Sequence, residues 1–168
     1  MRGGLIGPGK EGKVPVRKLK EFLDEKKIKY VTITHSLAYT AQETAVSAHI
    51  PGKGLAKTVI LKVDGKMIMA VVPAPRKLDF DLLREALGAR KVEMANEAEF
   101  KDRFPECDIG AMPPFGNLYG MDVISDGILA ENDDIAFNAG SHTELLKLAY
   151  KDFLELVKPK VATFSLSR

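Results

Sequence analysis

The spacing of hydrophobic residues along the chain predicts an α+β fold. Apolar side chains three or four positions apart predict helices at residues 16–27 and 141–157, and capping residues predict helices at residues 40–48, 79–87 and 97–104. Alternating or β-branched runs predict strands at residues 29–34, 56–63, 66–72, 91–95, 121–125, 135–138 and 161–166. The pattern shows no internal repeat and no linker. We therefore expect one domain at residues 15–168, behind a flexible leader at residues 1–14.

Short polar motifs mark the ends of several of these elements. The capping box, in which a polar side chain and a glutamate three residues later satisfy each other's backbone amides, fits Thr40–Glu43, Asn96–Glu99 and Ser141–Glu144. Asp-Gly between two hydrophobic runs is a strong signal for a tight hairpin, and it occurs at Asp64-Gly65. We expect the third capping box to open the longest helix of the chain, which ends near Val157.

The composition is that of an ordinary soluble globular protein, with 45% hydrophobic and 29% charged residues among 168. The single cysteine, Cys107, cannot form an internal disulfide, which points to a reducing compartment. No apolar run approaches the length of a membrane span, and residues 1–13 lack the apolar core of a signal peptide. We therefore expect a cytoplasmic protein. Its net charge of +2 is too balanced to indicate nucleic-acid binding, but it permits contact with a short RNA end.

Lys57 is the most informative single residue. Side chains alternate along a strand, so Lys57 shares a face with Val59, Leu61 and Val63, whereas Lys62 lies on the other face. The three apolar residues must face the core or a cavity, and a lysine beside them needs an anionic partner or loses its charge. The alternative is that this end of the strand frays and the lysine extends into water.

A long loop at residues 107–120 contains glycine and tandem proline. Pro113-Pro114 stiffens the loop, and Gly110 and Gly116 permit unusual backbone angles or a close approach of another segment. Such a loop can present backbone amides to a ligand oxygen. A rigid surface connection without a binding role is the alternative.

Residues 138–142 join a predicted strand to a predicted helix. Free amides at the start of a helix attract anions or a developing oxyanion. The same helix dipole would disfavour a charged imidazole at His142, so we expect it to be neutral near pH 7. An exposed histidine without a task is the alternative. His35, next to a strand end, is a second candidate for lining a pocket, and a structural role is its alternative.

Other motif matches fail on their context. Residues 7–12 fit GxGxxG by letters, but no strand precedes them, and residues 52–58 lack the glycines of a phosphate-binding loop. The chain has no GxSxG motif for a serine nucleophile. The three histidines and Cys107 lack metal-ligand spacing, and the acidic neighbours of Cys107 would blunt it as a nucleophile. We therefore expect neither a metal nor a cofactor.

Six motifs follow one another in a recognisable order. They are Thr-Ala-Gln-Glu at 40–43, Ala-Lys-Thr-Val at 56–59, Val-Val-Pro-Ala at 71–74, Ala-Leu-Gly-Ala at 86–89, the loop at 110–116 and the turn at 138–142. This order, over about residues 16–160, resembles the YbaK/ProX-type aminoacyl-tRNA deacylases. That family is related to the editing domain of bacterial prolyl-tRNA synthetase.

The resemblance implies a single domain with a curved, mixed, largely antiparallel sheet surrounded by helices. It places the family's essential lysine at Lys57, its GxxxP loop at Gly110 through Pro114, and the histidine of the synthetase domain at His142. The turn at residues 139–142 differs from the Gly-Gly-Lys turn of the YbaK subgroup. The resemblance therefore does not name the amino acid that is removed.

The implied function is a trans-editing hydrolase that deacylates mischarged aminoacyl-tRNA by attack of water on the ester. Its implied partners are the acceptor end of the aminoacyl-tRNA and an aminoacyl-tRNA synthetase. Lys57, which would bind the terminal phosphate or ribose, and His142 are the implied catalytic residues. The implied substrate-binding residues are His35, Tyr39, Thr40, Gly110, Met112, Pro114, Phe115, Gly116, Asn138, Gly140 and Ser141, of which Tyr39, Met112 and Phe115 would shape a small side-chain pocket.

Two other functions fit the same residues. A non-catalytic module would use the pocket to hold an aminoacyl group or a synthetase, and a simpler hydrolase would act on free amino-acid esters or amides. The residues also leave open whether His142, a backbone carbonyl or the ribose hydroxyl of the substrate accepts the proton from water. The oligomeric state is likewise left open.

Overall fold

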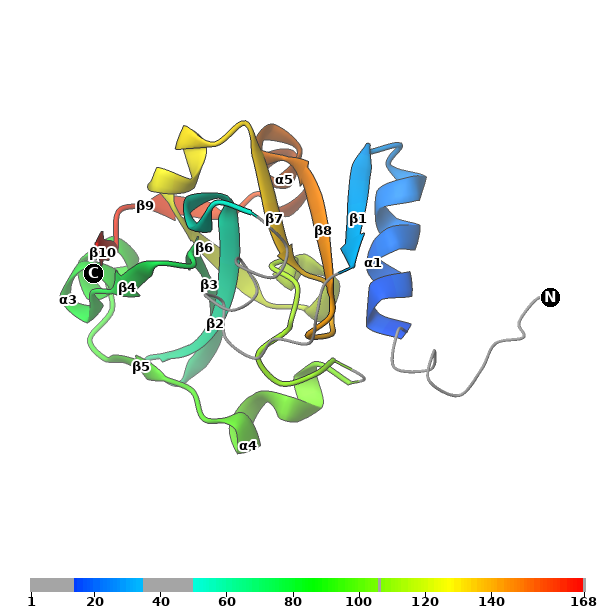
Figure 1. Cartoon of the computed structure of the whole chain (residues 1–168). Coiled ribbons are helices and arrows are strands. Elements are labelled where there is room, and N and C mark those ends of the chain that lie inside the picture. The colour runs from blue at the N-terminus through cyan, green and yellow to red at the C-terminus, as the bar shows by residue number, and fades with distance from the viewer. Residues whose placement is uncertain (1–13, 35–49, 106, 168) are drawn as a thin grey trace.

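The computed structural model describes residues 14–34, 50–105 and 107–167, and within them a mixed sheet carries helices on both faces (Figure 1). The helices are α1 (Val14–Glu25), α3 (Phe80–Leu87), α4 (Glu97–Phe100) and α5 (Tyr150–Val157), with 3-10 turns η2 (Gly52–Gly54), η3 (Lys101–Arg103), η4 (Gly116–Tyr119) and η5 (Gly127–Glu131). The strands are β1 (Tyr30–Thr34), β2 (Leu55–Val63), β3 (Lys66–Pro73), β4 (Arg76–Leu78), β5 (Val92–Met94), β6 (Asp122–Asp126), β7 (Asp134–Asn138), β8 (Glu144–Ala149), β9 (Lys160–Ala162) and β10 (Ser165–Ser167).

The large sheet has the strand order β1-β8-β7-β2-β3-β6-β9, and β5 also pairs with β2. Three pairs, β2 with β7, β3 with β6 and β6 with β9, are parallel, and the remaining pairs in the described residues are antiparallel. The predicted single α+β domain with a mixed, largely antiparallel sheet is confirmed. The parallel pairing of β2 with β7 brings the start of β2 beside the end of β7, and this junction positions the candidate site.

The local signals in the sequence placed the first hairpin and two helices correctly. Strands β2 and β3 form the predicted hairpin, and its turn residues Asp64 and Gly65 have φ angles of 48° and 86°. The side chain of Asp79 accepts hydrogen bonds from the first amides of α3, and Gly88 ends that helix with a φ of 60°. The capping box at Asn96–Glu99 is also present, although the helix that it opens is only one turn long.

The predicted helix at residues 141–157 is wrong in its first half. Residues Glu144–Ala149 form strand β8 between β7 and β1, and α5 begins only at Tyr150. Both neighbouring strands pair with β8, so hydrogen bonds on its two edges outweigh the helix preference of its leucines. Ser141 caps no helix, because the strand β8 follows it. Its hydroxyl accepts a hydrogen bond of 3.4 Å from the amide of Thr143 within the turn between β7 and β8.

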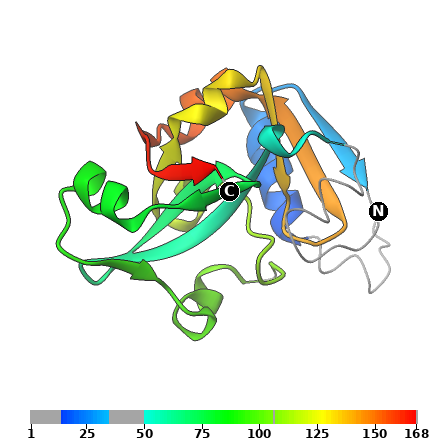
Figure 2. The same cartoon turned by 60° about the vertical axis from the view of Figure 1, so that its left-hand side comes forward.

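The predicted last strand at residues 161–166 is in fact two short strands in different sheets. Strand β9 extends the large sheet beside β6, whereas β10 pairs with β4, a strand that the sequence pattern did not indicate (Figure 2). Buried Asp126 secures this arrangement. Its carboxylate accepts hydrogen bonds from the amide of Phe164 and the hydroxyl of Ser165, so the C-terminal segment is tied to the end of β6.

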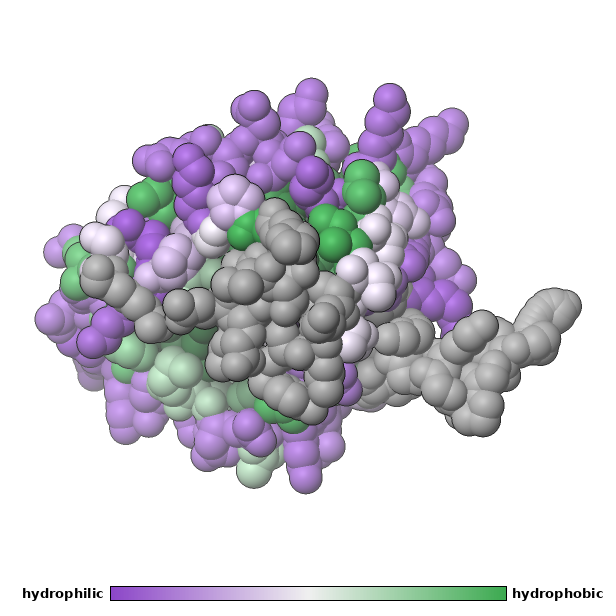
Figure 3. Space-filling model, viewed as in Figure 1, coloured by the Kyte–Doolittle hydropathy of each residue, from purple (hydrophilic) through white to green (hydrophobic). Residues whose placement is uncertain are grey.

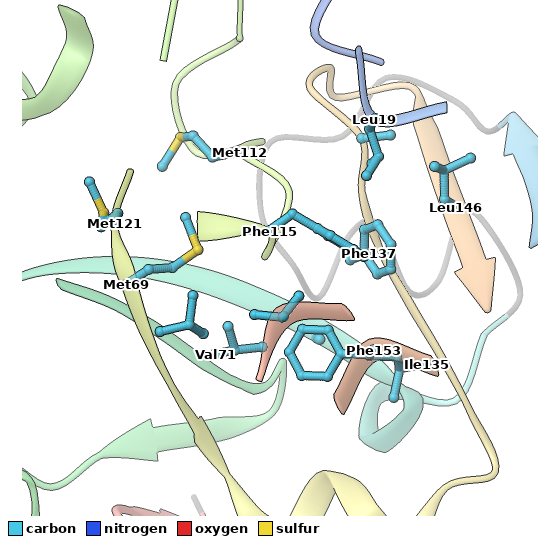
Figure 4. Close-up of a cluster of buried hydrophobic side chains, with 14 of the residues drawn as sticks. Leu19, Met69, Val71, Met112, Phe115, Met121, Ile135, Phe137, Leu146 and Phe153 are labelled. Atoms are coloured by element: carbon cyan, nitrogen blue, oxygen red, sulfur yellow. The ribbon is translucent and has the colours of Figure 1, made fainter. Parts of the chain in front are cut away.

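The core lies on both faces of the sheet. One face is covered by α1 and α5, whose side chains meet Phe115 and Phe137 in a large cluster (Figure 4). The opposite face packs against α3 through a second cluster that contains Leu83 and Phe164. Each large apolar side chain buried in this way contributes about 1.5–3 kcal/mol to stability. Hydrophilic residues predominate around the outer surface in the view of Figure 3.

Residues 1–13 of the predicted leader and the helix predicted at residues 40–48 lie outside the described residues. Val14, the last residue of the predicted leader, is instead the first residue of α1. Within the residues that are described, helices long and apolar enough to cross a membrane are absent.

Candidate functional site

Strand pairing places Lys57 and Asn138 next to each other. In the parallel ladder Ala56 is the partner of Phe137, and the next residue on each strand is Lys57 and Asn138. Because neighbouring residues of paired strands point to the same face of a sheet, we infer that the two polar side chains project together. Both residues are half-buried.

The predicted alternation along β2 agrees with the two cores. Leu61 and Val63 belong to the α3 cluster with Val59 packed against it, and Ile60 belongs to the cluster on the opposite face. The residues that follow Lys57 on its face of β2 therefore belong to an apolar core. The residue that precedes Lys57 on this face, Leu55, belongs to a small apolar cluster with Ala74, Ala136 and Leu145.

The turn after Asn138 is tied to the glycine-proline loop by backbone hydrogen bonds. The amide of Asp108 donates to the carbonyl of Gly140 at 2.9 Å, and the amide of Gly140 donates to the carbonyl of Ala111 at 2.9 Å. The two features that the sequence singled out separately, about thirty residues apart, thus form one unit. We call this unit, residues 108–112 with residues 139–142, the loop–turn pair.

His142 adds a side-chain link within the loop–turn pair. Its Nε2 lies 2.7 Å from the carbonyl oxygen of Ile109, and only 7% of the residue is exposed. A carbonyl can only accept, so Nε2 must carry the hydrogen in this bond. Because α5 begins at Tyr150, His142 does not lie in the first turn of that helix. The expectation that the imidazole of His142 is neutral rested on a position at the start of a helix, and that position was wrong.

The two loop glycines are required for different reasons. Gly110 has a φ of 83°, a conformation that residues with a Cβ rarely adopt. Gly116 has no such angle, but an added Cβ would lie 2.5 Å from the carbonyl oxygen of Met121, which is far closer than real contacts. Gly110 is exposed at the loop–turn pair, whereas Gly116 is buried.

Residues 111–116 of the loop are part of the core and do not form a surface connection. Residues 111–116, including Pro114, are buried, and Met112 and Phe115 are 5% and 0% exposed. The ring of Phe115 contacts Phe137 with a centroid distance of 5.5 Å, and both lie in the cluster of Figure 4. Phe115 thus packs the loop against β7, the strand that carries Asn138, and this contact holds the loop in place.

Several backbone amides of the loop–turn pair remain for a ligand. The amides of Asp108, Ala111, Ala139 and Gly140 already donate to carbonyls. Those of Ile109, Gly110, Met112 and Ser141 make no hydrogen bond within the described residues. These four are therefore the donors that could face a developing negative charge.

Sequence reasoning missed Ile109, whose carbonyl oxygen holds His142 and whose side chain is 41% exposed. A backbone carbonyl acts independently of its side chain, so the sequence offers no signal for this role.

His35, Tyr39 and Thr40, which the resemblance placed in the site, lie outside the described residues. Clusters of three or more histidine, cysteine or acidic side chains that could bind a metal do not occur in the described part of the chain.

Comparison with known proteins gives one family. Residues 35–156 match the model of the aminoacyl-tRNA editing domain. A protein of Escherichia coli (strain K12) named multifunctional Ser/Thr-tRNA deacylase ProXp-y is 27% identical over 160 residues, which cover 92% of this chain and 95% of that protein. The prolyl-tRNA editing protein ProX of Acetoanaerobium sticklandii is 26% identical over 148 residues, covering 84% of this chain and 90% of that protein.

A solved structure confirms the fold. The crystal structure of the hypothetical protein APE2540 superposes with a TM-score of 0.79 over 89% of this chain and 99% of that one, at 20% identity.

Proposed function

The chain belongs to the family of aminoacyl-tRNA editing domains, and on that premise we propose that it is a trans-editing hydrolase. It releases a wrongly attached amino acid from the terminal adenosine of tRNA by attack of water on the ester. The family membership rests on the match over residues 35–156. The names of the E. coli and A. sticklandii relatives, a Ser/Thr-tRNA deacylase and a prolyl-tRNA editing protein, support the reaction.

The observation that carries the proposal is the loop–turn pair beside Lys57. An aminoacyl ester is labile, so a protein that hydrolyses it mainly needs to hold the carbonyl and stabilise the oxyanion. We assign the oxyanion to the free amides of Gly110 and Met112 or of Ser141. Lys57 binds the phosphate or ribose of the terminal adenosine from the neighbouring strand.

His142 has a positioning role in this proposal. Its Nε2–H donates to Ile109, so that nitrogen cannot take a proton from water while the bond is made. The bond instead fixes the backbone of Ile109 and Gly110 against the turn. This role keeps the amide of Gly110 in place for the substrate.

The test is a panel of mischarged tRNAs. Serine, threonine, alanine and cysteine are attached to tRNA for proline and to their own tRNAs, and release of free amino acid is measured. We expect release from a subset of the panel, led by the seryl and threonyl esters because of the E. coli relative. Addition of EDTA should leave the rates unchanged.

The same panel separates the other functions. Binding of the charged tRNA without release would support a non-catalytic module. Equal rates on a free amino-acid ester and on the charged tRNA would support a simpler esterase. A pull-down with prolyl-tRNA synthetase tests the proposed association with a synthetase, and its absence would leave the deacylase to act alone.

A further inference from the structure

Asn138 holds a buried oxygen without a partner. Its side-chain Oδ1 is shielded from solvent, and it accepts no hydrogen bond in the described structure. Buried polar atoms are nearly always paired, because an unpaired one loses its bonds to water and gains nothing in return. An exception at the end of β7, beside Lys57 and next to the loop–turn pair, therefore needs an explanation.

One other side-chain oxygen in the described residues shares this property, and its surroundings differ. Ser125 Oγ is buried on β6, where the residue is 0% exposed between its neighbours Val71 and Val161. Strand β6 is three strands away from β7 in the sheet, about 14 Å at the usual strand spacing. Ser125 therefore lies in the core away from the loop–turn pair, whereas Asn138 lies at a half-buried strand end.

The surroundings of Asn138 restrict which group could complete its hydrogen bonding. The ammonium of Lys57 projects from the same face, so a second cation at this point would be repelled. A hydroxyl carries no charge and can both donate and accept, so it can satisfy the carboxamide of Asn138 in either orientation. A hydroxyl is thus the group that fits best.

We propose that Asn138 Oδ1 is a specificity-determining acceptor that takes a hydrogen bond from a hydroxyl of the bound aminoacyl-adenosine end. This inference rests on the proposed function and adds the chemical group that is recognised. The hydroxyl has two sources, the side chain of a seryl or threonyl group and the free hydroxyl of the terminal ribose. If the side chain is the source, an alanyl group is rejected because it leaves the oxygen of Asn138 unpaired.

Stable analogues test the inference without any turnover. The terminal adenosine is linked by an amide to serine, to alanine, or to serine on a ribose that lacks the free hydroxyl, and binding to the full chain is measured by calorimetry. We expect the wild type to bind the seryl analogue about tenfold or more tightly than one of the other two. The Asn138→Ala variant should bind all three within about twofold of one another.

The two analogues that the wild type binds with different affinities identify which hydroxyl donates to Asn138. Discrimination of serine from alanine assigns the side-chain hydroxyl, and discrimination of ribose from deoxyribose assigns the ribose hydroxyl. Equal relative affinities in wild type and Asn138→Ala would overturn the inference. Failure of the wild type to bind any of the three would overturn it as well.

Two further variants control for folding. Ser125→Ala removes the other buried unpaired oxygen and should leave the discrimination unchanged. Asn138→Asp keeps an acceptor oxygen and should retain the discrimination that Asn138→Ala loses. Loss of discrimination in Ser125→Ala would show that the effect comes from general loosening of the sheet, and it would contradict the inference.

The failure of this inference is distinguishable from failure of the proposed function. A wild type that releases no amino acid from the tRNA panel, but whose analogue binding depends on Asn138, refutes the hydrolase and keeps the acceptor. A wild type that deacylates with the same serine-to-alanine preference and the same ribose requirement as Asn138→Ala refutes the acceptor and keeps the hydrolase.

Discussion

Strand β2 carries a lysine near each of its ends, and the two lysines have different surroundings. Lys62 forms an ion pair with Glu99, whose hydrogen bond and charge raise the pKa of Lys62 above its ordinary value. Lys57 lies beside the end of β7, where Asn138 and the loop–turn pair meet. The same residue type thus completes a surface ion pair at one end and faces the candidate site at the other.

The polar groups around the two ends differ in the same way. At the far end of β2, which follows Lys62, the carboxylate of Asp64 accepts hydrogen bonds from the amides of Arg90 and Lys91, so the polar groups of the turn pair within the chain. At the near end of β2, which carries Lys57, the neighbouring Asn138 has an unpaired oxygen. Polar groups that are satisfied within the protein hold structure, and a buried one that is not satisfied indicates where a ligand would bind.

The largest effect should come from removing the lysine at the near end. We expect Lys57→Ala to lower the rate of deacylation by about 100-fold or more, the size of effect seen when one preorganised electrostatic contact to a reacting group is lost. The tRNA panel substrate that the wild type cleaves fastest serves for the measurement. The melting temperature should stay close to that of the wild type.

Lys62→Ala is the matched control for that variant. It removes a lysine from the same strand but from the opposite face, together with the ion pair to Glu99. We expect its rate to remain within about twofold of the wild type, because an exposed ion pair contributes little. Equal losses of activity in the two variants would erase the contrast between the ends of β2.

An intermediate effect should come from His142. In His142→Ala the bond to the carbonyl of Ile109 is lost, and Gly110 is free to move. Misplacement by about 1 Å can cost up to about 100-fold in rate, so we expect kcat to fall by about 10- to 100-fold with a smaller change in KM. Single-turnover deacylation by the two proteins measures this loss.

His142→Gln separates a positioning role from a general base. Its amide N–H can still donate to the carbonyl of Ile109, so this variant should recover much of the activity. The dependence of its rate on pH should match that of the wild type. A glutamine variant as inactive as the alanine variant, with a lost step in the pH profile between pH 5 and 8, would assign His142 as the base instead.

The parts of the fold that follow local rules were predictable from the sequence. The Asp64-Gly65 turn and the caps Asp79 and Asn96 act within a few residues, so the sequence contains all the information that they use. Alternation along β2 also predicted that Val59, Leu61 and Val63 share one face, and all three belong to or pack against the same core cluster.

The predictions of secondary structure were wrong where contacts with segments distant in the sequence determine the structure. Glu144–Ala149 reads as a helix locally, but hydrogen bonds to β7 and β1 make it a strand. The start of α5 gave no signal, because its N-cap, Ala149, has no side chain that could cap it.

The candidate site shows the same division. Pattern and resemblance picked out Gly110 and His142 individually, but the bonds that join them run through backbone atoms of Asp108, Ile109 and Ala111. Backbone atoms are common to every residue, so no residue choice at these positions could signal the connection. The unpaired oxygen of Asn138 likewise became visible only once its neighbours were placed.

The smallest effect should come from the turn at the far end. The amides of Lys91 and Arg90 donate to the carboxylate of Asp64 and hold its pKa below the ordinary value. A carboxylate whose pKa is lowered by folding stabilises the protein at pH values above its unfolded pKa of about 4, and this contribution is lost as the pH falls through the folded-state pKa. Asp64→Asn removes the charge, keeps an acceptor oxygen and tolerates the φ of 48°.

We therefore expect Asp64→Asn to melt at most a few degrees below the wild type at pH 7. The difference should shrink as the pH is lowered and disappear near pH 2, where both side chains are uncharged. Thermal unfolding at a series of pH values measures this, and deacylation at pH 7 should be unchanged because Asp64 lies at the end of β2 remote from Lys57. A difference in melting temperature that grew toward low pH would show that the charge of Asp64 destabilises the turn, and the two ends of β2 would then no longer differ in how their polar groups are satisfied.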